Sequence, residues 1–261
     1  MNVQKPSREL SLEEILTWTF DLYSKNIVMF LIPIMITALI SGSFSVPIAS
    51  YITKMGEIDR GAPPDVVLSQ LWSYISTLLA LAFVFGIISG IVGTIAYGVC
   101  VKCASDLIEK GKASLGVSFN FTVTKLLSLL VAALITGILI ALGFLALIVP
   151  GIILSIMFYL VIPTIIIEDI GAFDSLSRSR RLVSNRWLKT FVLSLIVGII
   201  TGFVAVIGSL IGTPLGIYGW FLSSIIAAFV QPIFPISLTV YYFSMLAKEE
   251  QRILPPPPPP F

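Results

Sequence analysis

Two long uncharged runs, separated by a short charged segment, constrain the fold of this chain more than any other feature. Residues 126–167 and 190–247 contain no Asp, Glu, Lys or Arg, whereas residues 168–189 between them hold 8 of the chain's 30 charged residues. A membrane-spanning helix needs about 20 apolar residues. Each run is therefore long enough for two crossings, and the charged segment is predicted to be an aqueous elbow between two membrane hairpins.

The composition supports a membrane class and excludes several others. Hydrophobic residues make up 57% of the chain and charged residues only 11%, against about 25% charged residues in soluble domains. A net charge of +2 gives no basic footprint for nucleic acid, so no nucleic-acid partner is expected. With two cysteines and no histidine, neither a metal site, another cofactor nor a disulfide framework is predicted.

The N-terminal half is predicted to hold an amphipathic helix and two membrane helices. Residues 1–26 carry the capping-box pattern Ser11 to Glu14, which predicts a helix in the interface plane; the alternative is that these are the first turns of a continuous first span. Residues 27–51 form one span. Residues 66–101 form a second, whose helix is expected to continue to Lys110 and to project into water at its C-terminal end. Residues 111–124 alternate apolar and polar side chains, which leaves either an irregular interfacial segment or a short helix.

The C-terminal half is predicted to hold four membrane helices. The first uncharged run is split by the turn signal at 149–151, and the second by the Gly- and Pro-containing stretch at 212–219. The fold class is therefore all-α, a polytopic membrane protein with six transmembrane helices in three hairpins joined by amphipathic elbows. Its parts are an N-terminal tail and amphipathic helix at 1–26, one six-helix domain at 27–248, and a proline-rich tail at 249–261.

The distribution of basic residues predicts the orientation. Of the 16 Lys and Arg residues, 14 lie in the two terminal segments, the 102–125 loop and the central elbow, and only Lys54 and Arg60 lie in the loop on the opposite side. Short cytoplasmic loops are enriched in Lys and Arg. Both termini are therefore expected in the cytoplasm, in a multi-pass protein of the cell membrane.

The elbow supplies the candidate site. It is predicted to form an interfacial helix with Asp174 or Ser175 as its N-cap. Its cations could bind anionic lipid head groups or a protein partner, or serve only as an orientation anchor: Arg178, Arg180, Arg181, Arg186 and Lys189. Glu168, at the end of the preceding span, is expected to pair with an elbow arginine as a structural latch.

Glycines spaced four residues apart predict close helix packing, within this chain or against a second copy. The glycines concerned are Gly86, Gly90, Gly198, Gly202, Gly208 and Gly212. Cys100 and Cys103 are expected to be small packing residues. The six prolines after Leu254 favour an extended tail, either disordered or a docking peptide for an aromatic groove.

The Pro150-Gly151 turn, Pro163, Glu168, the stretch from Ala172 to Val183 and the final Val240-Tyr-Tyr-Phe243 resemble a known family. They are similar to the membrane domain found with some bacterial glycerophosphoryl diester phosphodiesterases and to its free-standing prokaryotic relatives. The resemblance implies a six-helix fold and brings no reaction, because the phosphodiesterase barrel is missing from this sequence.

Two functions are expected from these features. The first is a non-catalytic membrane protein that organises lipids or partner proteins at the cytoplasmic face. The alternative is a permease or channel for a small neutral or amphipathic solute. An enzyme is not expected, since no nucleophile, base and orienting group can be assembled from the polar residues. No Asp, Glu, Lys or Arg lies in the middle of a span, which disfavours an ion-coupled transporter.

Overall fold

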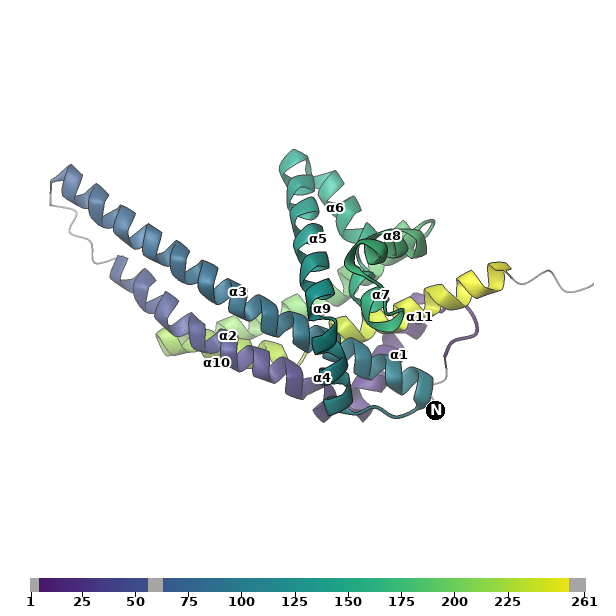
Figure 1. Cartoon of the computed structure of the whole chain (residues 1–261). Helices are drawn as coiled ribbons and strands as arrows, with labels where there is room; N and C mark the ends of the chain where they lie inside the picture. The colour runs from purple at the N-terminus through teal and green to yellow at the C-terminus, as the bar shows by residue number, and fades with distance from the viewer. Residues whose placement is uncertain (1–4, 56–62, 254–261) are drawn as a thin grey trace, which may run out of the picture. The chain divides into compact units, whose positions relative to one another are not determined.

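The computed structural model describes residues 5–55 and 63–253, and within these residues all regular structure is helical (Figure 1). The predicted all-α class is therefore confirmed. The helices, in chain order, are α1 Leu12–Lys25, α2 Ile27–Met55, α3 Pro64–Lys110, α4 Leu115–Thr124, α5 Leu126–Ala146, α6 Ile148–Met157, α7 Val161–Ile167, α8 Ala172–Val183, α9 Trp187–Gly212, the 3-10 helix η1 Thr213–Tyr218, α10 Gly219–Ala228 and α11 Ile233–Ile253.

Six helices in the described part of the chain are long and apolar enough to cross a membrane. They are 27–54, 64–110, 126–146, 148–167, 187–216 and 219–251, so that α6 with α7, and α10 with α11, each count as one span. The number agrees with the six spans expected from the uncharged runs.

The chain divides into two compact units that share three helices. Unit 1 comprises residues 1–30, 94–199 and 232–261, and unit 2 comprises residues 31–93 and 200–231. Helices α2, α3 and α9 each begin in one unit and end in the other. Unit 1 contains α1, α4 to α8, α11 and the charged residues of the elbow, whereas unit 2 is built mainly from uncharged helix.

Helix α1 is separate from the first span. The Ser11 hydroxyl accepts a hydrogen bond from the Glu14 amide at 3.2 Å, and the Glu14 carboxylate accepts one from the Ser11 amide at 2.8 Å, which completes the capping box. At the other end Asn26 leaves helical geometry, with φ −130° and ψ 33°. The alternative of one continuous helix is therefore wrong. Ile15, Thr19 and Leu22 are buried, and α1 packs on α11.

The C-terminal end of α3 forms part of the core of unit 1, which corrects the expectation that it projects into water. Residues from Ala96 to Ile108 are largely buried, and both Cys100 and Cys103 are fully so. Small side chains allow the neighbouring helices to approach closely. Asp106 is only 5% exposed, and its carboxylate accepts hydrogen bonds from Lys102 at 3.1 Å and Lys110 at 2.7 Å, so its charge is neutralised inside the unit.

The alternating segment 111–124 contains helix α4 rather than an irregular segment. Only Ser118 and Thr122, four residues apart, are buried on it. A helix satisfies its own backbone hydrogen bonds, whereas a single strand at a membrane surface would leave them unpaired. Helix geometry therefore prevails over the strand-like spacing of the side chains.

The α5–α6 hairpin turns at Leu147, two residues before the predicted turn, and Pro150 lies in the first turn of α6. Proline is tolerated there because the first helical amides have no partner within the helix. The two helices meet at Gly143 and Gly151. A Cβ added at Gly143 would lie 3.0 Å from the Gly151 backbone.

Two of the spans are interrupted near their middle. Residues 158–160 separate α6 from α7, and residues 229–232 separate α10 from α11. At the first interruption the Tyr159 ring packs edge-on against Phe234, the second residue of α11, with centroids 5.9 Å apart. Both breaks lie a few residues before a proline, Pro163 in the first span and Pro235 in the second.

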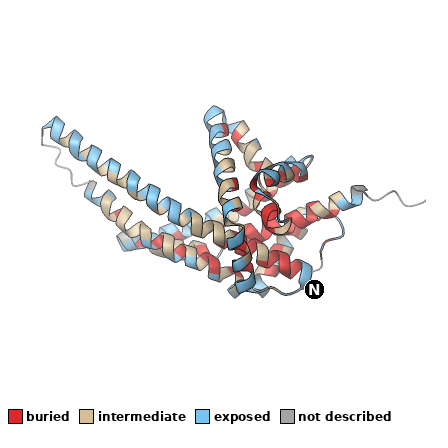
Figure 2. Ribbon diagram, in the orientation of Figure 1, coloured by how far each residue is buried: buried red, intermediate tan, exposed pale blue. Residues whose placement is uncertain are grey.

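Unit 2 is held together by stacked rings and by glycine contacts. Phe44 of α2 stacks on Phe85 of α3 with centroids 4.3 Å apart. Much of the N-terminal part of α3 is exposed (Figure 2), including Trp72 and Phe83. Exposed apolar side chains of this kind suit a helix that is covered by lipid.

Candidate functional site

Helix α8 is the amphipathic element that carries the candidate site. It begins after Gly171, which is extended at φ −73° and ψ 170°, so Asp174 and Ser175 lie inside the helix and the predicted N-cap is wrong. The Ser175 amide already donates to the Gly171 carbonyl at 3.0 Å. The chain turns at each end of α8 through a residue in the left-handed region, Asp169 at φ 58° and Asn185 at φ 66°, a conformation that Asp and Asn tolerate better than most residues.

The buried face of α8 covers the break between α6 and α7. Ser179 is fully buried. Its hydroxyl donates to the Met157 carbonyl at 2.8 Å and accepts from the Leu160 amide at 3.1 Å. One side chain thus supplies a partner to two backbone groups at the interruption, the Leu160 amide and the Met157 carbonyl, and an unpaired buried backbone group is costly. The position of α8 and the geometry of the broken span are therefore coupled.

Arg178 joins three helices. Its Nε donates to both carboxylate oxygens of Glu168, at 2.7 and 2.9 Å, and its two terminal nitrogens donate to Glu249 of α11 at 2.8 and 2.7 Å. The Tyr242 hydroxyl also donates to Glu168, at 2.7 Å. The hydrogen bonds that Arg178 donates to Glu249 and Glu168 outweigh partial burial and raise the pKa of Arg178. Such paired, fork-shaped contacts are the strongest kind of ion pair.

A second ionic cluster fixes the N-terminal segment and the start of α9. Glu9 accepts hydrogen bonds from Arg186 at 2.9 Å and from Lys189 at 2.8 Å, and Lys248 of α11 lies 3.4 Å away. Partial burial would raise the pKa of Glu9, but the hydrogen bonds from Arg186 and Lys189 and the Lys248 charge together lower it to about 2. Nearby, the Leu10 amide donates to Ser244 at 2.8 Å.

The five cations predicted as one dock therefore divide into two groups, which corrects the sequence-based expectation. Arg178, Arg186 and Lys189 are engaged by carboxylates of their own chain. Arg180 and Arg181 are exposed and make no ion pair with any described carboxylate. This division could not be predicted from the sequence, because Glu9 and Glu249, which pair with elbow cations, lie far from the elbow along the chain.

Arg180 shares its exposed stripe of α8 with an aromatic residue. Phe173, Ser177 and Arg180 are all exposed, and their spacing of four and three residues places them on one side of the helix. Phe173 is 72% exposed. An apolar ring and cations on the outer side of a short helix are the features of a helix that lies in a lipid interface. We refer to Phe173, Ser177, Arg180 and Arg181 as the outer face of α8.

Glu168 and Asp169 do not act as a pair of carboxylates. Glu168 is held by Arg178 and Tyr242, as described above, whereas Asp169 makes an ion pair with Lys125. The structure thus places Glu168 against an elbow arginine, the position expected of a latch. The cysteines belong to no group of three or more His, Cys, Asp or Glu residues that could hold a metal within residues 5–55 and 63–253.

The predicted packing glycines also divide. At Gly208 an added Cβ would lie 3.2 Å from the Ser223 carbonyl oxygen, and at Gly212 it would overlap the Gly219 backbone. At the other four an added Cβ would meet no described atom within 4 Å: Gly86, Gly90, Gly198 and Gly202. The structure therefore gives no close backbone contact in the Cβ direction at these four, and close packing there stays a prediction.

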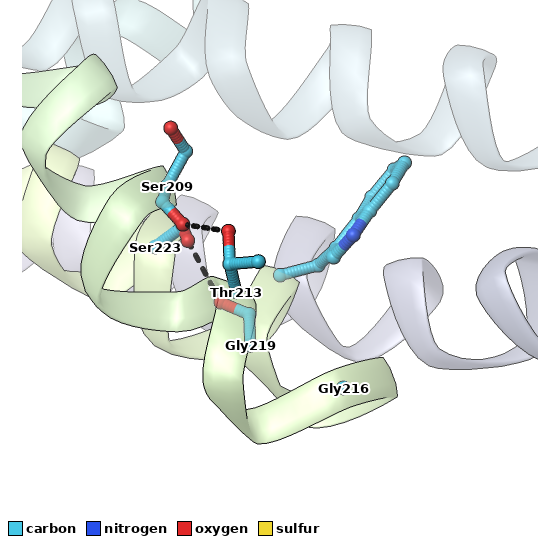
Figure 3. Close-up of a pocket in the computed structure, with 6 residues that line it drawn as sticks. Ser209, Thr213, Gly216, Gly219 and Ser223 are labelled. Carbon is cyan, nitrogen blue, oxygen red and sulfur yellow. Dashed lines mark hydrogen bonds between the residues drawn. The ribbon is translucent and has the colours of Figure 1, made fainter.

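A polar hollow of about 440 Å³ lies within unit 2, at the α9–η1–α10 turn. It is lined by Ser209, Thr213, Gly216, Gly219, Trp220 and Ser223 (Figure 3). Thr213 donates to the Ser209 carbonyl at 2.8 Å, and Ser223 donates to the Gly219 carbonyl at 2.7 Å. The hydroxyl hydrogens are thus used by the backbone, and only oxygen lone pairs remain free to accept bonds from a solute.

Six helices that are long and apolar enough to cross a membrane, in the described part of the chain, indicate an all-helical protein of membrane-spanning character. Within that class, the chain belongs to a family described as a domain of unknown function, DUF7847, whose model matches residues 22–246. The match includes the whole elbow and all six spans except the last few residues of the sixth. No curated protein and no solved structure matches the chain, so the resemblance to the membrane domain of the phosphodiesterases stays an expectation.

Proposed function

We propose that this protein is a non-catalytic integral membrane protein whose charged face lies in the cytoplasm and organises anionic lipids there. The observation that carries the proposal is the division of the elbow cations. Arg178, Arg186 and Lys189 bind carboxylates inside the protein and fix α8 in place, which leaves Arg180 and Arg181 on its outer face. A basic side chain near an anionic membrane surface contributes about 1 kcal/mol to binding.

The contacts that fix the position of α8 support lipid binding over a role limited to orienting the protein in the membrane. An orientation anchor needs only positive charge near the end of a span. Here α8 is held by Ser179 at the helix break and by Arg178 between two carboxylates, so the outer face has a fixed geometry. Because Phe173 and Arg180 point the same way, an aromatic ring and a phosphate-binding group are presented together.

The test compares two double variants of equal charge. Arg180→Gln with Arg181→Gln removes the exposed cations of α8, whereas Lys25→Gln with Lys112→Gln removes two exposed cations elsewhere, at the end of α1 and in the loop after α3. Each protein is purified from the membrane in mild detergent, and the retained lipids are measured by mass spectrometry. We expect the first variant to lose phosphatidylglycerol or another anionic lipid by about tenfold or more, and the second to retain it.

An unchanged lipid content in the arginine variant would refute lipid organisation by α8. If a co-purifying protein, or a second copy of the chain, is lost from that variant in place of lipid, the outer face binds a protein and the lipid proposal is wrong.

The polar hollow of unit 2 supports a second candidate, a permease for a small neutral solute that donates hydrogen bonds. Its free acceptors are the oxygens of Ser209, Thr213 and Ser223. Filling it with Thr213→Phe is expected to abolish solute flux into proteoliposomes, while Thr124→Phe on α4, at a site that is exposed, should leave flux unchanged. Absence of flux across a broad panel of neutral solutes in the unmodified protein would exclude this candidate.

A further inference from the structure

An apolar groove runs between α6 and the first turns of α9 in unit 1. It has a volume of about 560 Å³ and is lined by Ile152, Ile153 and Ile156 on one side and Trp187, Leu188 and Phe191 on the other. Leu188 is 76% exposed and Ile153 44%. Of the six side chains, only the Trp187 indole carries a hydrogen-bonding group, so the groove suits an apolar occupant.

The groove begins at the charged end of the unit and continues along the apolar spans. Ile156 lies next to Met157, whose carbonyl is bound by Ser179 of α8. Trp187 is the first residue of α9 and follows Arg186 directly. Tryptophan is enriched at the boundary between head groups and hydrocarbon. The groove therefore adjoins the charged elbow at Trp187 and is otherwise bounded by apolar helix.

The side chains of the groove fit an acyl chain better than another helix. Where helices of this protein approach closely, glycines make the contact, as at Gly143 with Gly151 and at Gly212 with Gly219. The groove contains only bulky branched and aromatic side chains, which keep a second helix backbone at a distance. A flexible hydrocarbon chain can follow such an irregular surface and bury it from other lipids.

Two exposed cations that precede Trp187 by a few residues specify the head group. Arg180 and Arg181 belong to the last turn of α8, and only Ser184, Asn185 and Arg186 separate that helix from Trp187. Neither arginine is paired with a described carboxylate, as shown above, whereas the adjoining cations are. Both guanidinium groups are exposed, although Arg181 also interacts electrostatically with Glu249, and exposed guanidinium groups complement a phosphate-bearing anionic head group.

We propose that the α6–α9 groove binds one acyl chain of an anionic glycerophospholipid, with its head group held by Arg180 and Arg181. This inference rests on the proposed function and deepens it, since it names a lipid class and places one chain of the lipid in a defined site.

The experiment uses the full-length protein in bilayers that contain a photoactivatable phospholipid with the reactive group on one acyl chain. The probe is supplied either as phosphatidylglycerol or as phosphatidylcholine, and cross-linked positions are mapped by mass spectrometry. We expect the phosphatidylglycerol probe to label residues 152–156 and 187–191 several-fold more than the other exposed apolar segments, and more than the phosphatidylcholine probe labels them.

Two exposed leucines of α9 give a matched pair of variants. Leu188→Trp fills the groove and is expected to reduce labelling there several-fold, while Leu195→Trp, at another exposed position of α9 (48% exposed), should not. Arg180→Gln with Arg181→Gln should abolish the preference for phosphatidylglycerol and leave the groove labelled equally by both probes.

Three results would overturn the inference: uniform labelling of all exposed helices, equal labelling of the groove by both probes in the unmodified protein, or cross-links from the groove to a second protein chain. These outcomes differ from failure of the proposed function. Suppose that the double arginine variant loses the anionic lipid, but that the photoactivatable lipid labels no groove residue in the unmodified protein. The proposal that α8 organises lipids then stands, and the acyl-chain site is wrong.

Discussion

Arg178 and Arg180 are only two residues apart in α8, yet their surroundings give them different tasks. Arg178 is 15% exposed and bridges the carboxylates of Glu168 and Glu249. Arg180 faces outward. Because successive helical residues point about 100° apart, a run of arginines necessarily divides between the inner and outer sides of the helix. The role of each arginine is thus fixed by the helix face on which it lies.

Replacing Arg178 is expected to destabilise the protein more than replacing Arg180. Arg178→Gln leaves two partly buried carboxylates unpaired, at a cost of about 2 kcal/mol, whereas Arg180→Gln removes a solvated charge and should cost little. Thermal unfolding in detergent, followed by tryptophan fluorescence, measures both. Equal melting temperatures for the two variants would contradict the bridging role of Arg178.

Glu9 makes stability depend on pH in a defined direction. Its pKa in the folded protein is about 2, below its ordinary value of 4.5, so the ionised form is favoured by folding. This contribution is complete above about pH 4.5 and is lost as the pH falls from there towards 2. Glu9→Gln should therefore melt lower than the unmodified protein at pH 7, and the difference should shrink as the pH falls below 4.5.

Glu13→Gln is the matched control for Glu9, because Glu13 is an exposed carboxylate of the adjacent helix α1. It should melt close to the unmodified protein at every pH. A pH-independent difference between the Glu9 variant and the unmodified protein would show that the carboxylate charge is not the stabilising feature.

At the scale of elements, the informative features are the interrupted spans and the helix that covers one of them. A continuous helix satisfies its own backbone, whereas an interruption inside an apolar span must find other partners. Ser179 supplies two of these between α6 and α7. The Ser179 hydroxyl of α8 thus stabilises the break between α6 and α7.

Ser179→Ala is expected to loosen this break. The Leu160 amide and the Met157 carbonyl would each lose a partner, at a total cost of about 2 kcal/mol. Hydrogen exchange measured by mass spectrometry should show faster exchange in residues 157–161. Ser177→Ala, on the exposed side of the same helix, should leave exchange there unchanged, and acceleration in both variants would contradict a specific role for Ser179.

The α9–η1–α10 turn depends on two glycines. A Cβ at Gly219 would lie 1.9 Å from the Gly212 carbonyl oxygen, whereas at Gly198 it would meet no described atom within 4 Å. Gly219→Ala should therefore lower the yield of folded protein and its melting temperature. Gly198→Ala should be neutral or slightly stabilising, since alanine favours helix by about 1 kcal/mol over glycine.

Equal effects of the two alanine substitutions would contradict the role of the Gly212–Gly219 contact in stability. The sequence could not separate Gly208 and Gly212, where a Cβ would press on neighbouring backbone, from Gly198 and Gly202, where it would not, because both pairs have the same four-residue spacing. Contact depends on which helices lie side by side, and the spacing within one helix carries no information on that.

At the scale of the whole molecule, charge and hydropathy predicted more than local side-chain patterns did. The uncharged runs predicted six spans because crossing a bilayer requires length and apolarity alone. The helix breaks at 158–160 and 229–232 could not be predicted, since broken and continuous apolar segments have the same composition. The elbow helix was expected, but the carboxylates that neutralise Arg178 and Arg186 come from residues 9 and 249, whose proximity only the tertiary fold reveals.

The polyproline tail and Arg60 lie outside the described residues, so the predictions for them are untested.

The central claim is that the outer face of α8 lies on the cytoplasmic side of the membrane, opposite Lys54. The most direct measurement is thiol labelling in intact cells by a reagent that does not cross membranes, with Arg180→Cys and Lys54→Cys each placed in a chain whose buried Cys100 and Cys103 are replaced by Ala. The account predicts that position 54 is labelled from outside and that position 180 is labelled only after the cells are opened. Labelling of position 180 in intact cells, with position 54 protected, would contradict it.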